Sequence, residues 1–141
     1  MPVKYLIAAT CLFLTSHVMA EQKPPAVSSS VLLKSSASWD GTPYKAYPEG
    51  QPELTVLQIN IPAETSLNWH THPIPNAAYV VSGELTVETR DSGERIHLKK
   101  GDTLPEMVDS VHRGKTGKVP VELIVFYAGA RDIPVSQPVT K

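Results

Sequence analysis

The stretch NWHTHPIPNAAYVVSGEL, residues 68–85, places two histidines just before an apolar run that ends near a glycine. His70 and His72 are two residues apart, so their side chains point to the same side of an extended chain. Two bare imidazoles are poorly placed there, because each disfavours protonation of the other. A divalent metal ion would use both lone pairs, and imidazole suits Zn, Cu, Fe and Ni. The pair therefore indicates a metal site whose other ligands come from elsewhere.

Two more histidines follow in the body of the chain. His112 lies about forty residues after the pair, in SVHRG, within a strand that we expect to follow a turn. A neighbouring strand is a common source of a third histidine ligand, so His112 is the candidate partner of the pair. His97, in RIHLK, has no partner nearby in sequence, and we expect an exposed or half-buried strand residue.

The body of the chain reads as short strands separated by turns, with little or no helix. The segment ELTVETR (84–90) alternates apolar and polar residues, a turn follows at 91–93, and ERIHLKK (94–100) returns as its hairpin partner. The segment LTVLQINIP (54–62) carries apolar side chains on both faces, so we expect much of it to be buried. The last strand, VPVELIVFYAG (119–129), is strongly apolar. Short strands at this spacing predict an all-β sandwich or barrel.

The first twenty residues resemble a secretory signal peptide. A lone Lys4 precedes an apolar stretch over 5–14, and the segment closes with Val18 and Ala20 at the positions that a signal peptidase reads. A retained membrane anchor is the competing interpretation, although the apolar part is short for a membrane span. We therefore expect a periplasmic or secreted protein. Cleavage after Ala20 would remove the single cysteine, Cys11, which leaves His, Asp, Glu or Asn as metal ligands.

The remaining chain divides into a lead-in, one domain and a tail. Residues 21–30 are rich in Pro and Ser and predict a flexible lead-in, residues 31–130 a single domain, and residues 131–141 a loose C-terminal tail. The net charge is −1, without clustered Lys and Arg, so we expect no nucleic-acid partner. We also expect no membrane attachment after signal cleavage.

A loop at 39–52 carries three aromatic residues, Trp39, Tyr44 and Tyr47, among prolines and glycines. A loop of this length and composition predicts either a lid over the mouth of the barrel or a packing surface for a second subunit. The simpler alternative is that these side chains cover one end of the core.

The order of these motifs resembles that of the cupin family. Cupins carry a first motif G-x5-H-x-H-x3,4-E-x6-G and a second motif G-x5-P-x-G-x2-H-x3-N. The first is similar to residues 63–83, with Ala63 near the place of the first glycine, and the second to residues 101–116. The resemblance spans Leu54 to about Gly129. It implies a double-stranded β-helix, or jelly-roll barrel, whose metal ligands are His70, His72 and His112.

The chain departs from these motifs where the chemistry is decided. Asn76 stands in place of the glutamate of the first motif, and an amide oxygen is a weak, neutral ligand. Three neutral imidazoles leave a divalent ion with its full charge and stronger Lewis acidity. Glu106 could restore the carboxylate, either as a fourth ligand or as a general base; otherwise it is an exposed carboxylate at a strand end. For Asn76 the alternative is an amide that bonds the backbone of a turn.

We therefore predict a small exported single-domain cupin that binds a divalent transition metal (Fe, Mn, Ni or Zn) and acts on a small organic molecule. The resemblance allows dioxygenase-like or isomerase-like chemistry, since cupins include both. Tyr79, Trp39, Tyr44 and Tyr47 are candidate walls of the substrate pocket. The alternatives are a non-catalytic module that binds a small ligand through a structural or ligand-anchoring metal, and a periplasmic metal buffer. The family resemblance also suggests a homodimer.

Overall fold

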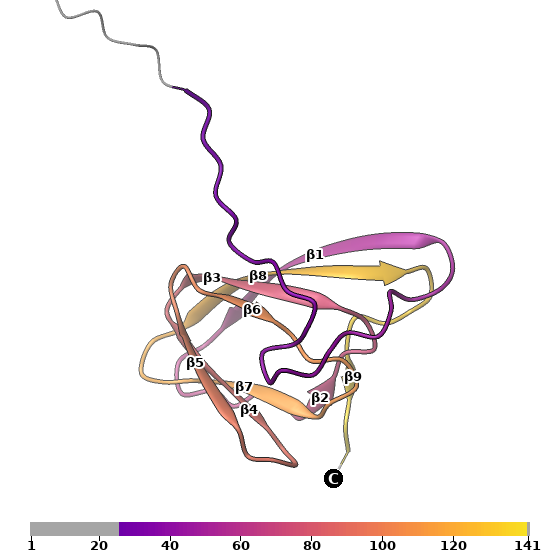
Figure 1. Cartoon of the computed structure of the whole chain (residues 1–141). Helices are drawn as coiled ribbons and strands as arrows, with labels where there is room; N and C mark the ends of the chain where they lie inside the picture. The colour runs from indigo at the N-terminus through magenta and orange to yellow at the C-terminus, as the bar shows by residue number, and fades with distance from the viewer. Residues whose placement is uncertain (1–25, 141) are drawn as a thin grey trace, which may run out of the picture.

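The computed structural model describes residues 26–140, and the predicted signal peptide lies outside them. The described chain forms nine strands and no helix, and so contains no helix that could span a membrane (Figure 1). The strands are β1 (Pro52–Ile61), β2 (His70–Thr71), β3 (Asn76–Ser82), β4 (Glu84–Thr89), β5 (Arg95–Lys99), β6 (Thr103–Pro105), β7 (His112–Thr116), β8 (Val121–Ala130) and β9 (Gln137–Pro138).

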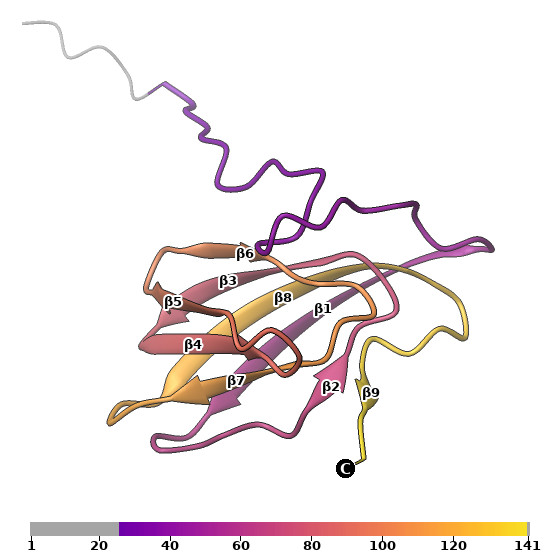
Figure 2. The same cartoon turned by 60° about the horizontal axis from the view of Figure 1, so that its bottom comes forward.

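Two antiparallel sheets enclose the core. One has the strand order β1-β8-β3-β6 and the other β5-β4-β7-β2-β9, and Figures 1 and 2 show them facing each other. Alternate side chains of β3 point between the sheets, where Asn76, Ala78 and Val80 are buried and the residues between them are half-buried. The predicted all-β barrel is confirmed.

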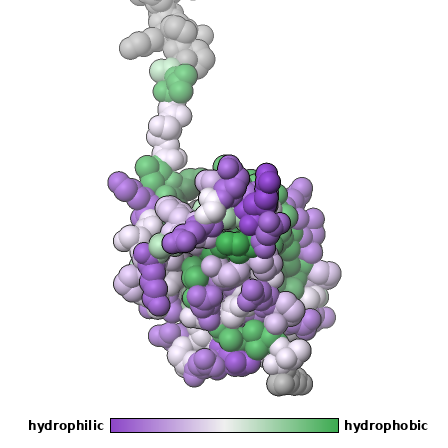
Figure 3. All heavy atoms as spheres, turned by 90° about the vertical axis from the view of Figure 1, so that its right-hand side faces the viewer, coloured by the Kyte–Doolittle hydropathy of each residue, from purple (hydrophilic) through white to green (hydrophobic). Residues whose placement is uncertain are grey.

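The expectation that β1 is buried on both faces was wrong. Leu57 and Ile59 pack against the core and Ile61 belongs to it, but Leu54 and Val56, on the opposite face, are 69% and 61% exposed. Val56 lies opposite Phe126 of β8, which is also exposed. Figure 3, which views the molecule from the right-hand side of Figure 1, shows patches of apolar surface among the polar residues. Phe126 borders a hollow that Leu33, Tyr44 and Tyr47 of the N-terminal segment also line, whereas Leu54 and Val56 remain largely exposed.

Gly83 fills a position that other residues would strain. It separates β3 from β4 with a φ of +78°, in the left-handed region that favours glycine, and a Cβ atom there would collide with the carbonyl oxygen of Pro120. The turn allows β3 to end in one sheet and β4 to begin in the other. Gly83, near the end of the quoted stretch, is therefore explained by both backbone conformation and space.

The C-terminal segment, expected to be loose or draped on the surface, lies along the surface of the fold up to residue 140. β9 pairs with β2, so that Pro138 lies opposite His70 and Gln137 opposite Thr71. Before β9, Ile133 and Val135 pack against the core. The sequence pattern missed this because a two-residue strand has no period, and the apolar residues here are separated by proline and polar residues.

Candidate metal centre

The two sheet positions that carry His70 and His112 are direct neighbours. Each residue begins a strand, β2 and β7 respectively, and the antiparallel register places one opposite the other. His72 follows directly after β2. The ring centroids of His70 and His112 are 4.6 Å apart, and the ring of His72 lies 5.0 Å from each. The three histidines that the sequence separates therefore form one cluster inside the barrel.

All three rings are oriented by backbone carbonyl groups. The acceptors of the three Nδ1 atoms are Asn68 for His70 at 2.9 Å, Val135 for His72 at 2.7 Å and Ser110 for His112 at 2.8 Å. Because a carbonyl oxygen can only accept, each neutral ring donates from Nδ1 and keeps its lone pair on Nε2. This is the arrangement by which metal-binding histidines are usually fixed.

The three histidines lie close enough together to bind one cation, and the two buried rings are held in the neutral form. One ligand atom from each ring lies within 4.8 Å of the others. Burial is the main cause that lowers the pKa of His72 and of His112 to about 4, and the neighbouring imidazoles lower it further. Both rings are then neutral near pH 7, so few protons compete with a metal ion for them.

Glu106 comes directly after β6 and adds a carboxylate beside His112. Its Oε2 lies 3.4 Å from Nε2 of His112, and neither atom has a hydrogen-bond partner within residues 26–140 although both are buried. Burial raises the pKa of Glu106 to about 7. Two ligands about 2.1 Å from one tetrahedral ion would be about 3.4 Å apart. The residues present therefore fit a divalent metal, with these two orphaned atoms as natural ligands.

A small, largely apolar cavity adjoins the cluster. It has a volume of about 70 Å³, and the three histidines, Glu106 and Tyr127 line it. The rest of its wall is apolar, formed by Ile59, Ile61, Leu67, Leu85, Val87, Gly114, Leu123 and Val125. Sites for drug-sized ligands begin at roughly 300 Å³, so this cavity suits a much smaller molecule.

Tyr127 is a cavity residue that the sequence interpretation missed. Its ring lies 5.7 Å from that of His72, and burial, followed by the Glu106 charge, raises its pKa to about 12. The hydroxyl is therefore a hydrogen-bond donor at neutral pH. The signal was present in the alternation of β8, because Tyr127 shares the inward face with Val121, Leu123 and Val125.

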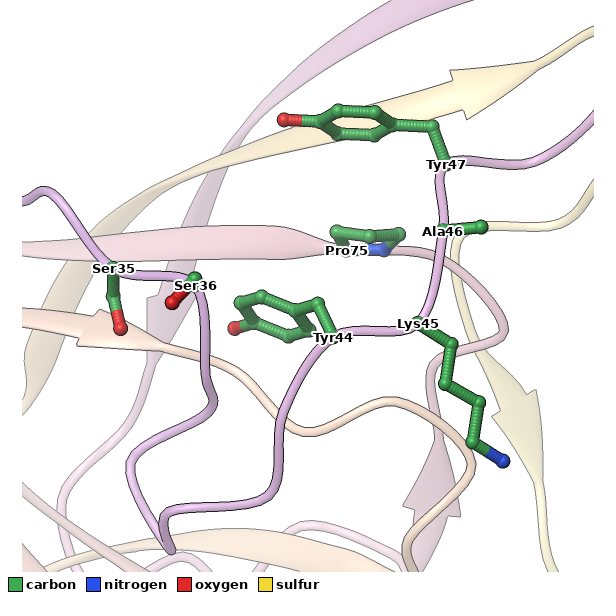
Figure 4. Close-up of a pocket in the computed structure, with 7 residues that line it drawn as sticks. All are labelled: Ser35, Ser36, Tyr44, Lys45, Ala46, Tyr47 and Pro75. Carbon is green, nitrogen blue, oxygen red and sulfur yellow. The ribbon is translucent and has the colours of Figure 1, made fainter.

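The predicted aromatic wall residues do not line this cavity. Trp39 packs against the core, and Tyr44 donates a hydrogen bond of 2.6 Å from its hydroxyl to the backbone carbonyl of Glu106. Tyr44 and Tyr47 line a surface hollow of about 340 Å³, where Figure 4 shows their rings pointing the same way with Pro75 between them. Tyr79 alternates with buried Ala78 and Val80, so it faces away from the barrel interior.

Comparison with known proteins assigns the chain to a family. A model of the cupin domain matches residues 57–127, half of the chain, and this range contains every residue of the cluster. The chain belongs to the cupin family. None of the curated proteins compared with this cupin matches it in sequence.

Solved structures share the cupin fold at low sequence identity. The DMSP lyase DddQ from Ruegeria pomeroyi DSS-3 is 18% identical with a TM-score of 0.55, over 72% of this chain and 49% of that one. The polyketide cyclase RemF from Streptomyces resistomycificus is 16% identical with a TM-score of 0.54, over 65% and 63%. An uncharacterized protein with a double-stranded β-helix domain from Klebsiella pneumoniae subsp. pneumoniae MGH 78578 is 21% identical with a TM-score of 0.53, over 70% and 87%. This cupin spans about half of the DMSP lyase.

At two positions where the cupin motifs have glycine, this chain has another residue with the positive φ that glycine favours. Asp109 replaces a glycine of the second motif and has a φ of 60°, and Glu64 has a φ of 53°. Glu64, rather than Ala63, is the residue six positions before His70, so the first motif begins one residue later than the sequence comparison placed it. At both positions this cupin retains the turn without the glycine.

The third departure, Asn76, faces the barrel interior but not the cavity. Its Nδ2 donates a hydrogen bond of 3.2 Å to the carbonyl of Ile74, and its Oδ1 is buried with no partner among the described residues. The walls of the three-histidine cavity include Glu106 and not Asn76. Glu106 is therefore the better placed of the two candidates.

Proposed function

We propose that this cupin uses a divalent transition metal, held by His70, His72 and His112, to convert a small organic molecule. The observation that carries the proposal is the convergence of three oriented imidazoles beside the buried, unpaired carboxyl oxygen of Glu106. Buried polar groups without partners are rare in folded proteins, and a bound ion can supply the partner that the protein lacks. That the DMSP lyase and the polyketide cyclase share the fold adds support.

The chain's own residues have distinct parts in this proposal. A bound metal would supply Lewis acidity, or redox chemistry if it is iron. The three imidazoles hold the ion, and Glu106 either completes its shell or moves a proton of the substrate. Tyr127 donates a hydrogen bond that orients the substrate, and the aliphatic walls exclude water. We favour dioxygenase-like or isomerase-like chemistry on a molecule small enough for the 70 Å³ cavity.

A non-catalytic module that binds a small ligand through the same metal is the second candidate. The observation in its favour is the small size of the cavity, together with the presence of one carboxyl group among its lining residues. A structural or ligand-anchoring metal would have a closed coordination shell, whereas an enzyme needs an open position.

We expect protein purified without a histidine tag and without added metal to carry about one metal ion per chain. Elemental analysis measures this content. Short-chain enols, diketones and hydroxy acids are then screened for O2 consumption and, without O2, for isomerised products. Turnover by the loaded protein, absent after chelation and restored by metal, supports the enzyme. Metal-dependent ligand binding without turnover favours the second candidate, and a protein that binds no metal contradicts both.

We also propose that the chain is exported to the periplasm or secreted. The support is the sequence of residues 1–20, with its basic start, apolar middle and Val-x-Ala end. A mature chain without cysteine agrees with an oxidising compartment.

We further propose that two copies of the chain pair through the outer face of β1 and β8. The support is the exposed apolar side chains of Leu54 and Val56 on β1, an edge strand of its sheet, and of Phe126 on the adjacent β8. A two-fold dimer uses the same surface patch on both subunits, which makes a second copy the natural occupant of this face.

Replacing both Leu54 and Val56 by serine is expected to convert a dimer into a monomer, because it removes the apolar area that drives pairing. Sedimentation equilibrium measures the mass. The matched control is Val119→Ser, an exposed valine in the turn before β8, which should leave the dimer intact. A wild-type monomer at high protein concentration would contradict the proposal.

A further inference from the structure

The metal centre receives one of its orienting carbonyl groups from the far end of the chain. His70 and His112 bond the carbonyls of residues two positions earlier, which belong to their own loops. His72 instead donates to the carbonyl of Val135, 63 residues away, at 2.7 Å. This is the shortest of the three bonds, and it depends on where the C-terminal segment lies.

Residues 131–140, which we name the C-terminal strap, are held in place along their length. Ile133 and Val135 pack against the core at its beginning, and β9 pairs with β2 further on. The amide of Val139 then donates a hydrogen bond of 2.9 Å to the carbonyl of Trp69, the residue before His70. Figure 2 shows the strap running back from the end of β8 to lie beside β2.

The strap therefore follows the backbone of the WHTH segment and reaches its second histidine from the side opposite the metal cavity. Besides the Val135 carbonyl, its contacts include the pairing of β9 with β2, the bond from Val139 to Trp69 and the two apolar side chains. At its beginning, the amide of Arg131 also donates a hydrogen bond of 2.9 Å to the carbonyl of Gln51, just before β1. The other strands of this sheet pair without the strap. They are joined in the order β5-β4-β7-β2, and β9 is added at the edge beside β2.

We propose that the C-terminal strap is a positioning element of the metal centre. Through the Val135 carbonyl it fixes the tautomer and the orientation of His72, so that Nε2 faces the ion. This inference rests on the proposed three-histidine metal site and adds a determinant of its affinity. Partners that orient a ligand from behind are usually worth about 10- to 100-fold in metal affinity. The strap carries that effect for one ligand of the three.

The test is a chain that ends at Ala130, compared with one that ends at Val139 and keeps every strap contact described above. We expect the shorter chain to bind Co2+, followed by its visible absorption, about 10- to 100-fold more weakly. The chain that ends at Val139 should bind like the full-length protein. Equal affinity of all three overturns the proposal.

A second measurement separates orientation of His72 from general loosening. Nitrogen NMR of histidine-labelled, metal-free protein reports which ring nitrogen carries the proton. We expect all three rings of the full chain to be protonated on Nδ1, and the shorter chain to lose this preference at His72 alone. Equal changes at His70 and His112 would mean that the strap acts on the whole fold, and would overturn the proposal.

Two further provisions keep the outcome clear. If the chain ending at Ala130 does not fold, the full-length variant with Ile133→Ser and Val135→Ser releases the strap by removing its apolar contacts with the core. If the wild-type protein binds no metal, the proposed function fails, but the NMR measurement on metal-free protein still tests the strap. Retention of the Nδ1 proton at His72 in the released variant would contradict the inference.

Discussion

His70→Ala is expected to weaken metal binding by more than about 100-fold while the barrel stays folded. Loss of a residue that only orients a ligand costs about 10- to 100-fold, so loss of a ligand itself should cost more. His70 is half-buried, so its removal leaves little cavity in the core. Calorimetric titration with Zn2+ measures the affinity, and circular dichroism checks the fold.

The same substitution should also remove the stabilisation that the metal provides. A ligand present at 100 times its dissociation constant stabilises the native state by about 2.7 kcal/mol, and the variant should gain almost none of this at the same metal concentration. The control is His97→Ala, at an exposed histidine whose ring contacts Thr86 and Glu84 outside the centre. Equal Zn2+ affinity of the His70 variant and the wild type would rule out the three-histidine centre.

The sequence predicted the parts of this centre that repeat at short range. His70 and His72 share a face because alternate residues of an extended chain do so, and His112 entered through its place in a second motif. The structure adds that His112 lies opposite His70 in the register of β2 and β7. Periodicity predicts which face a side chain takes, but which strands become neighbours depends on the whole topology.

What the sequence could not supply came from contacts between distant segments. The Val135 carbonyl is a backbone group, and every residue type carries one, so no residue letter signals its role at His72. The bond from Tyr44 to the Glu106 carbonyl is equally invisible. The prediction that both faces of β1 are buried was wrong for a related reason. The sequence does not distinguish an apolar side chain that packs in the core from one that lies on the surface.

Glu106→Gln is expected to change stability in opposite directions with and without metal. In metal-free protein the carboxyl group is buried, and burial raises its pKa from the ordinary value of 4.5 to about 7. Between these two values the unfolded chain has lost the proton and the native chain has kept it. The unfolded state then binds fewer protons, so the free energy of unfolding falls as pH rises from about 4.5 to about 7.

Glutamine lacks this cost, so the metal-free variant should be more stable than the wild type above pH 7. At 1.36 kcal/mol per pKa unit the difference is about 3 kcal/mol at most, and it should disappear near pH 4. Urea unfolding in the presence of a chelator, repeated across this pH range, measures it. The control is Glu53→Gln, at an exposed carboxylate, which should show no such dependence.

The same variant should bind the metal ion more weakly than the wild type does. A carboxylate 3.4 Å from Nε2 of His112 contributes a negative charge to a divalent ion, and a neutral amide does not. We expect Zn2+ affinity to fall about tenfold or more, and turnover to fall with it. Glu106 is then a group whose burial destabilises the metal-free fold and whose charge stabilises the bound ion, as expected of a functional residue rather than a structural one. Unchanged affinity with lost turnover would instead assign it to proton transfer, and no change in either would remove it from the site.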